Sequence, residues 1–338
     1  MAAAWLIEHG IGETRAALVD GAAILAARID WHGAALAPGL VAQARVASRL
    51  AGTRRGTVQF ADGAVALVDG LTPALTEGKR ALFQVTRAAI AEKGRTKLPM
   101  ARPAPDGTEP RPAPSLAEQL AAGPFPVRTL RQTDRDLDEA GWDDLVEEAM
   151  TGEIAFARGG LCVSPTPAMT LIDVDGSPPL AALALAAVPA IVGALARLNI
   201  GGSVGIDFPT LADKRERQSV DAALGEALAS LEALLGWRAE RTAMNGYGFV
   251  QLVSRLERPS LPALFARHPM GAAARQLLRR AERVTGPGTL LLTCHPALRA
   301  AVLPDWEAEL VRRTGRVLRW ATDPALAPTA GFAQVLSA

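Results

Sequence analysis

The apolar pattern is most regular between residues 170 and 235, where it predicts two strands and two helices. The runs TLIDVDG (170–176) and GSVGIDF (202–208) are short and apolar, as buried strands are, and each has an aspartate near its C-terminal end. Residues 179–198 are rich in Ala and Leu and long enough for one crossover helix, and residues 212–235 carry an apolar stripe of helical period. This order predicts a strand–helix–strand unit with parallel strands.

Asp173 and Asp207 are the first candidate site residues, because they end the two predicted strands and stand 34 residues apart. Neighbouring parallel strands lie about 4.8 Å apart, and open α/β sheets bind ligands at their carboxyl edge. Mg²⁺ is held by one or two carboxylates, with water and phosphate oxygens in its other positions. The alternative is that each acid caps the next helix or faces water, and the spacing alone leaves both readings open.

The rest of the chain alternates short apolar runs with turn residues, which predicts a mixed α/β protein of several parts. The predicted elements are a hairpin over 4–29, a small β-barrel from runs within 40–97, a proline-rich linker without folded structure over 99–126, an acidic helix over 134–150, strands within 151–171 and 237–253, and a C-terminal unit of helix 272–284, strand 288–293, helix 296–303 and strand 316–321.

One stretch has the length and lack of charge of a membrane-spanning helix. Residues 176–196 carry no charge over 21 positions, which satisfies the length rule for a transmembrane helix. Three prolines lie in it, alanine dominates it, and no Lys/Arg asymmetry marks its ends. A helix buried between a sheet and its neighbours is therefore favoured over a membrane helix.

Composition adds a local charge imbalance. The 338 residues are 49% apolar, which predicts two to four compact units and excludes wholesale disorder. The net charge is only +1, but residues 31–100 carry ten Lys/Arg against four Asp/Glu, and residues 131–153 carry two against nine. The basic predicted barrel could meet a polyanion, or its cations could simply be a solvated surface.

The two cysteines, Cys162 and Cys294, lie in apolar runs without a CxxC pair. We expect buried, reduced thiols in a cytoplasmic protein, without a disulfide framework or a cysteine zinc site. The first ten residues lack the pattern of a signal peptide.

The predicted helix over 212–235 begins with Lys214, Arg215 and Arg217, although cations at a helix N-terminus oppose the macrodipole. Either an anion binds there or the cations pair with Asp213 and Glu216.

Several segments, in one order, resemble the ribonuclease E/G family in a much shortened form. The strongest likeness runs over 171–261, where IDVDGS, ALARLNIGGSVGIDF, ADKRERQSVDAALGEAL and GYGFVQLVSRLERPSL are similar to successive family motifs. RAALVDG near the N-terminus and LTEGKRALFQVTRAAIAEKG at 75–94 are similar to further family segments.

The resemblance implies a multidomain α/β (α+β) architecture. Its parts would be an RNase H-like domain in two pieces (1–35 and 127–155), an S1-like barrel (36–100), the proline-rich linker (101–126), a DNase I-like catalytic domain (156–262) and a small domain (263–338).

The resemblance also implies an activity, namely Mg²⁺-dependent endonucleolytic cleavage of single-stranded RNA, with Mn²⁺ able to substitute. Asp173 and Asp207 match the magnesium ligands, and Asp175 stands at the position of an active-site Asn. A metal-activated water would attack the phosphodiester. The RNA-binding residues we expect are Phe60, Lys93 and Arg95 in the barrel and Lys214, Arg215 and Arg217 in the helix.

The departures from the family are specific. The zinc-link cysteines are missing after residue 261, so no zinc is expected and a homodimer stays an open alternative. Gly246 replaces an Arg, SPPLAALALAA replaces a basic loop, and most of a 5′-end sensor is missing, with only a weak echo at 127–129. Two functions remain, an impaired endoribonuclease, which we favour, and a relative that binds RNA or a protein without cutting. No membrane partner is expected.

Overall fold

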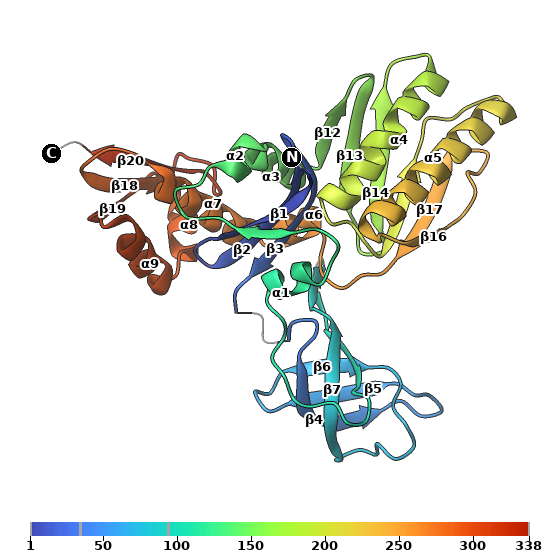
Figure 1. Ribbon diagram of the computed structural model, residues 1–338, viewed down its shortest axis with the longest axis horizontal. Coiled ribbons are helices and arrows are strands. Elements are labelled where there is room, and N and C mark those ends of the chain that lie inside the picture. Colours follow the sequence, from blue (N-terminus) through green and yellow to red (C-terminus); the bar gives the residue numbers. More distant parts are fainter. Residues whose placement is uncertain (1, 34–35, 93–94, 337–338) are drawn as a thin grey trace. The chain divides into compact units, whose positions relative to one another are not determined.

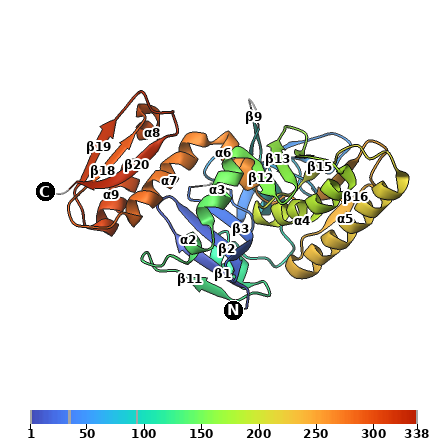
Figure 2. The same ribbon diagram turned by 90° about the horizontal axis from the view of Figure 1, so that it is seen from above.

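The computed structural model describes residues 2–33, 36–92 and 95–336 and has a mixed α+β fold. The chain forms two compact units, one from the residues up to 32, 124–146 and from 264 onwards, the other from 33–123 and 147–263. The elements follow the chain order seen in Figures 1 and 2.

The strands are β1 (Ala4–His9), β2 (Glu13–Asp20), β3 (Ala23–Trp31), β4 (Val41–Arg49), β5 (Gly56–Phe60), β6 (Val65–Val68), β7 (Arg80–Arg87), β8 (Ile90–Glu92), β9 (Arg95–Lys97), β10 (Met100–Pro103), β11 (Val127–Thr129), β12 (Glu153–Phe156), β13 (Gly159–Pro165), β14 (Thr170–Gly176), β15 (Ser203–Asp207), β16 (Ala239–Arg241), β17 (Phe249–Ser254), β18 (Thr289–Cys294), β19 (Leu318–Thr322) and β20 (Gly331–Leu336).

The helices are α1 (Leu116–Ala121), α2 (Asp136–Glu139), α3 (Trp142–Thr151), α4 (Leu180–Arg197), α5 (Lys214–Leu235), α6 (Leu261–Arg267), α7 (Pro269–Arg283), α8 (Pro296–Ala301) and α9 (Pro304–Thr314).

The predicted barrel is confirmed as a closed barrel of five strands in the order β10-β6-β5-β4-β7. Its core holds the inward side of the alternating strands, including Val46, Val58, Phe83 and Val85. The closing strand β10 pairs with both β6 and β7, although it lies where the sequence predicted only a linker.

The expectation of an unfolded linker is therefore wrong at two places, β10 and α1. Helix α1 begins with a capping box in which Ser115 and Glu118 satisfy each other's backbone N–H groups. That S-x-x-E signal was in the sequence, but the many prolines around it obscured it.

The predicted strand–helix–strand unit is confirmed within a six-stranded sheet of order β12-β13-β14-β15-β17-β16. β14 and β15 are parallel, whereas the other neighbouring strands in this sheet are antiparallel. Helices α4 and α5 lie side by side on one face of the sheet (Figure 1). Ile172, Val174 and Ile206 are buried on that side, so the helices cover the face of β14 and β15 that carries these residues.

Helix α4 is long and apolar enough to cross a membrane, by length and composition alone. Half of its 18 residues are buried within the fold, and burial of this kind is also found in the core helix of a globular domain. Within the described part of the chain it is the one helix with these properties, which is weak evidence for a span.

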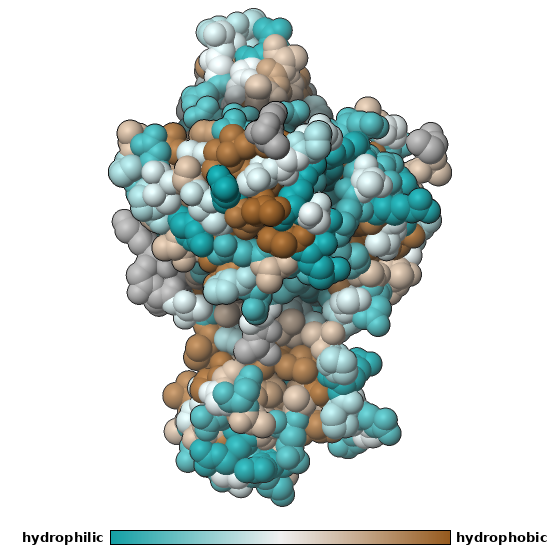
Figure 3. Space-filling view, turned by 90° about the vertical axis from the view of Figure 1, so that its left-hand side faces the viewer, coloured by the Kyte–Doolittle hydropathy of each residue, from teal (hydrophilic) through white to brown (hydrophobic). Residues whose placement is uncertain are grey.

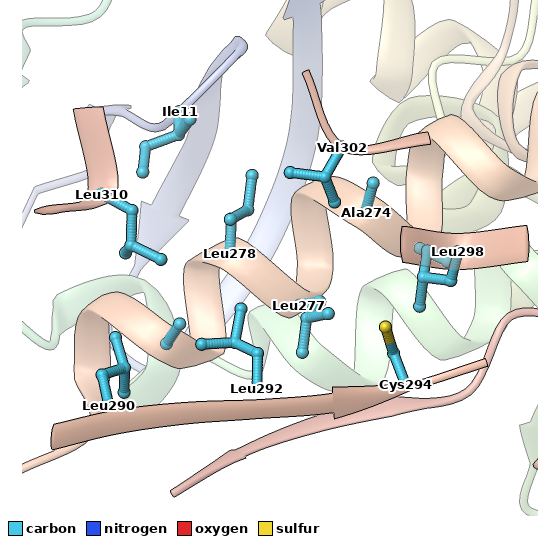
Figure 4. Packing of buried hydrophobic residues seen from close by; sticks show 12 residues of the cluster. Ile11, Ala274, Leu277, Leu278, Leu290, Leu292, Cys294, Leu298, Val302 and Leu310 are labelled. Atoms are coloured by element: carbon cyan, nitrogen blue, oxygen red, sulfur yellow. The ribbon is translucent and has the colours of Figure 1, made fainter. Parts of the chain in front are cut away.

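The other compact unit contains two sheets, β11-β1-β2-β3 and β19-β18-β20. β11 pairs in parallel with β1, so a segment near residue 128 joins the N-terminal strands. Figure 4 shows the core beside the C-terminal sheet, where Leu277 and Leu278 of α7 pack with Leu292 and the buried Cys294 of β18. Ile11, from the turn between β1 and β2, completes this core. The face drawn in Figure 3 carries hydrophobic residues in more than one place, among hydrophilic ones.

Three details of this unit differ from the predicted elements. The acidic helix predicted over 134–150 is two helices, α2 and α3, separated at Gly141, whose φ of +87° is incompatible with a continuing helix. The helix predicted over 296–303 is α8, which ends at Ala301, and Pro304 begins a separate helix, α9, that was not among the predicted elements. Strand β20 was not predicted at all.

Buried charges pair with one another in this unit. The Arg15 side chain is fully buried and donates to Glu8 over 2.5 Å and to Glu13 over 2.8 Å. Arg279, also buried, pairs with Asp138 and Asp143, and Arg283 pairs with Glu8 over 2.6 Å. The network therefore connects β1, β2 and α7 with the segment 136–151, which are far apart in the sequence.

We predict that Arg15→Met lowers the free energy of unfolding of this unit by about 3–5 kcal/mol, because it strands buried carboxylates without their partner. Urea unfolding followed by tryptophan fluorescence measures the change. The matched control is Arg238→Met, which breaks a 2.6 Å pair whose arginine side chain is 83% exposed and is expected to change little. An equal effect of the two substitutions would contradict a role for burial.

Candidate metal centre

Asp173 and Asp207 occupy directly opposed positions in the parallel pairing of β14 with β15. Because side chains alternate between the faces of a sheet, both aspartates lie on the face opposite Ile172 and Ile206, away from α4 and α5. Asp207 is exposed and Asp173 is half-buried. The structure thus brings together the two residues that the spacing in the sequence paired.

Asp175 lies on the same face, two residues further along β14, and is exposed. The pKa of Asp173 is raised, first by burial and then by the negative charges of Asp175 and Asp207. Among the described residues, none forms an ion pair with these three acids. The cluster therefore carries an electrostatic cost that a bound cation would remove.

These residues fit Mg²⁺ in its usual mode. No three His, Cys, Asp or Glu side chains converge as a ligand set anywhere in residues 2–33, 36–92 and 95–336. Two neighbouring carboxylates, with water and phosphate oxygens completing the octahedron, are nevertheless the common protein contribution to a magnesium site. Asp173 and Asp207 are the residues that would hold the ion.

The neighbouring strands complete the open face. Cys162 on β13 is the register partner of Asp173 and is exposed, so the expectation of a buried thiol is wrong there, whereas Cys294 is buried as expected. Gly205 lies on the same face as Asp207, and a Cβ at this position would lie 2.7 Å from the Phe249 ring. A glycine at position 205 therefore gives this ring its place beside the acids.

The cations predicted at the start of α5 divide into two groups. Asp213 caps the helix by accepting from the backbone N–H of Arg215, and Arg217 donates to the carbonyls of Leu211 and Ala212 over 2.5 and 3.1 Å. One guanidinium nitrogen of Arg217 is thereby bound to its own loop, and its expected role as an RNA contact stays a prediction. The side chains of Lys214 and Arg215 are exposed and form no ion pair with described residues, so they are available to an anion.

The loop after β16 approaches the carboxyl end of β15. The backbone N–H of Phe208 donates to the carbonyl of Gly248 over 3.2 Å, and Thr210 Oγ1 donates to the carbonyl of Tyr247 over 3.4 Å. Tyr247 was not among the predicted site residues. Its signal was its place in an Asn-Gly-Tyr-Gly turn, directly before the strand that pairs with β15.

In the barrel, Phe60 is only 6% exposed and belongs to the core, so the expectation that it stacks on bases is wrong. It ends β5 on the inward side of the alternation, which hides its ring. Lys93 lies outside the described residues, and for Arg95 the structure describes only the backbone, in β9. A groove of about 500 Å³ on the barrel is lined partly by Arg54 and Arg102.

Comparison of the sequence with models of known protein families finds no match. Comparison with curated proteins also finds no significant match. The likeness to the ribonuclease E/G family therefore rests on the short motifs of the sequence.

We predict that Asp173→Asn stabilises the metal-free protein at pH 7 and abolishes its stabilisation by Mg²⁺. A raised folded-state pKa means that stability falls as the pH rises from the ordinary value, 3.8, through the raised one, so wild type carries the full cost at neutral pH. Mg²⁺ at about a hundred times its Kd should stabilise wild type by about 2.7 kcal/mol. Thermal unfolding with and without Mg²⁺ measures both effects.

The control is Asp106→Asn, which removes an exposed acid without a side-chain hydrogen bond and should leave the Mg²⁺ response intact. An undiminished Mg²⁺ response in Asp173→Asn would place the ion elsewhere.

Proposed function

We propose that this protein is a magnesium-dependent endoribonuclease that hydrolyses single-stranded RNA. The observation that carries the proposal is the parallel register that sets Asp173 beside Asp207 on one sheet face, without an ion pair to any described residue. The repulsion between the neighbouring carboxylates is not offset by an ion pair with any described residue, and a bound cation would relieve it. The choice of RNA as substrate is supported by the family likeness of the motifs around both acids.

In this proposal each acid has a distinct role. Asp173 and Asp207 would hold the ion. When bound, Mg²⁺ would activate a water molecule for attack and neutralise charge on the phosphate oxygens. Asp175 is exposed next to Asp173 and accepts a hydrogen bond from the attacking water, which orients it. The water oxygen would bond to phosphorus as the water gives up a proton to solvent, the P–O bond to the leaving nucleotide would break, and the leaving oxygen would take a proton from solvent.

The RNA backbone is held by cations at the same edge of the sheet. Lys214 and Arg215 are exposed at the start of α5, a few residues after Asp207, and compensate phosphate charge. A single strand suits an open sheet face better than a stiff duplex, because its backbone can turn toward a site at the strand ends.

A second candidate is an RNA-binding protein that does not cut. It is favoured by Gly246, which leaves the loop beside β15 without the arginine that the family has there. A lost donor to the transition state typically costs about 10²–10³ in rate, so slow cleavage is expected of the enzyme too.

We predict Mg²⁺-dependent cutting of a labelled A/U-rich single strand, reduced at least about 10²-fold by Asp173→Asn or Asp207→Asn, because each loses a ligand to the ion. Gel analysis of a time course, with EDTA as the metal-free reaction, measures the rate. Asp106→Asn is again the control and should cut as wild type does. Equal trace cutting by wild type and both variants would indicate contamination and favour the second candidate.

We also predict that Gly246→Arg raises the rate of cleavage, by up to about 10²-fold, by returning a cationic donor to the site. The position can accept it, since no atom lies within 4 Å of a Cβ built there. Gly246→Ala, which changes the backbone without adding a donor, is the matched control. Rates for Gly246→Arg at or below those of Gly246→Ala would contradict this explanation of the slow rate.

A further inference from the structure

Tyr247, the chain's single tyrosine, is 79% exposed in the loop beside the candidate metal centre. Asp207 is the register partner of Phe249, which follows Tyr247 by two residues. The carbonyl of Tyr247 accepts from Thr210, three residues after Asp207. The tyrosine is therefore at the same edge of the sheet as the acids.

The backbone that carries Tyr247 is held in place on both sides of the ring. Asn245 Oδ1 accepts from the N–H groups of Tyr247 and Phe249 over 2.9 and 3.1 Å. Asp221 on α5 accepts from the N–H of Met244 over 2.9 Å, which anchors the start of the turn.

The end of the turn is held by glycine. Gly248 has a φ of +94°, and a Cβ there would lie 2.6 Å from the carbonyl oxygen of Phe208, so only glycine allows this approach. Because the turn is already formed, a ligand that binds the ring loses little backbone freedom.

The packing of the fold does not account for this ring. It covers no core, and its hydroxyl makes no hydrogen bond to the described residues. The chemistry around it suits a nucleotide, since Lys214 and Arg215 are free for phosphate at the start of α5 and the acid pair suits a cation. An exposed aromatic face beside a phosphate site is how single-stranded nucleic acids are commonly bound, with the base on the ring.

We propose that Tyr247 is a base-stacking residue whose ring receives the nucleobase next to the phosphate that would meet a cation held by Asp173 and Asp207. The nature of the ligand rests on the proposed function, but the stacking does not depend on whether the strand is cut. Because every base has a π face, this contact would tolerate sequence and position the strand rather than read it.

The first test measures binding of a fluorescent A/U-rich RNA strand in EDTA, where no cutting occurs, at several salt concentrations. Tyr247→Ala should weaken binding about tenfold at each salt concentration, and Tyr247→Phe should bind as wild type does. The salt slope should not change in either variant, whereas Lys214→Ala should reduce it by about 0.7. Phe332→Ala, which removes an exposed aromatic ring in the other compact unit, is the matched control and should have no effect.

The second test locates the base. A strand with abasic sites at all positions should bind wild type and Tyr247→Ala equally, and 4-thiouridine in the normal strand should crosslink to Tyr247, identified by mass spectrometry. Equal affinity of Tyr247→Ala and wild type for the normal strand, or an equal loss on the abasic strand, overturns the stacking proposal. A base-dependent loss without any Mg²⁺-dependent cutting overturns the nuclease proposal and leaves stacking intact. Failure of wild type to bind RNA both in EDTA and in Mg²⁺ overturns both proposals.

Discussion

The parallel register of β14 and β15 is the constraint on which the candidate site depends. Ile172 and Ile206 are buried beneath the two helices. Because side chains alternate along a strand, Asp173 and Asp207 lie on the opposite, open face. A slip of one strand by a single residue would turn its aspartate toward the helices and its isoleucine toward water. The apolar side of the sheet therefore maintains a pair of like charges that would separate if they were free to do so.

Two groups of acidic residues in this protein have opposite surroundings. In the unit that contains β1 and β2, buried Glu8 and Glu13 are matched by Arg15, and the charges serve to connect distant segments. On the open face of the six-stranded sheet, Asp173 is crowded by Asp175 and Asp207 and forms no ion pair with the part of the chain that the structure describes. Paired charges are what a fold needs in order to bury them, whereas uncompensated ones are typical of a site that awaits a ligand.

Two glycines determine how closely the neighbouring loop and ring approach this site. Gly205 provides space for the Phe249 ring, and Gly248 allows the turn that carries Tyr247 to approach the chain after Asp207. Neither glycine has chemistry of its own. They allow the turn with Tyr247 to lie at the edge of the sheet where β14 and β15 end. Asp173, Asp207 and the exposed cations at the start of α5 are at the same edge.

The sequence by itself determined the elements whose signals are local. The hydrophobic period and the turn residues were sufficient to predict α4, α5, the barrel strands other than β10, and the strand–helix–strand order that contains Asp173 and Asp207. Burial of one face of an element imposes a repeat that can be read along the chain. The same local reasoning failed at residues whose environment comes from elsewhere. Phe60 was predicted to contact RNA and lies in the barrel core, and Cys162 was predicted to be buried and is exposed. Strand β10 was missed because it lies in a proline-rich segment.

Only the tertiary structure decided which face of each strand is covered, what Arg217 binds, and that Tyr247 lies beside the acids. Each of these follows from contacts between segments remote in sequence, and no periodicity along a single segment encodes them.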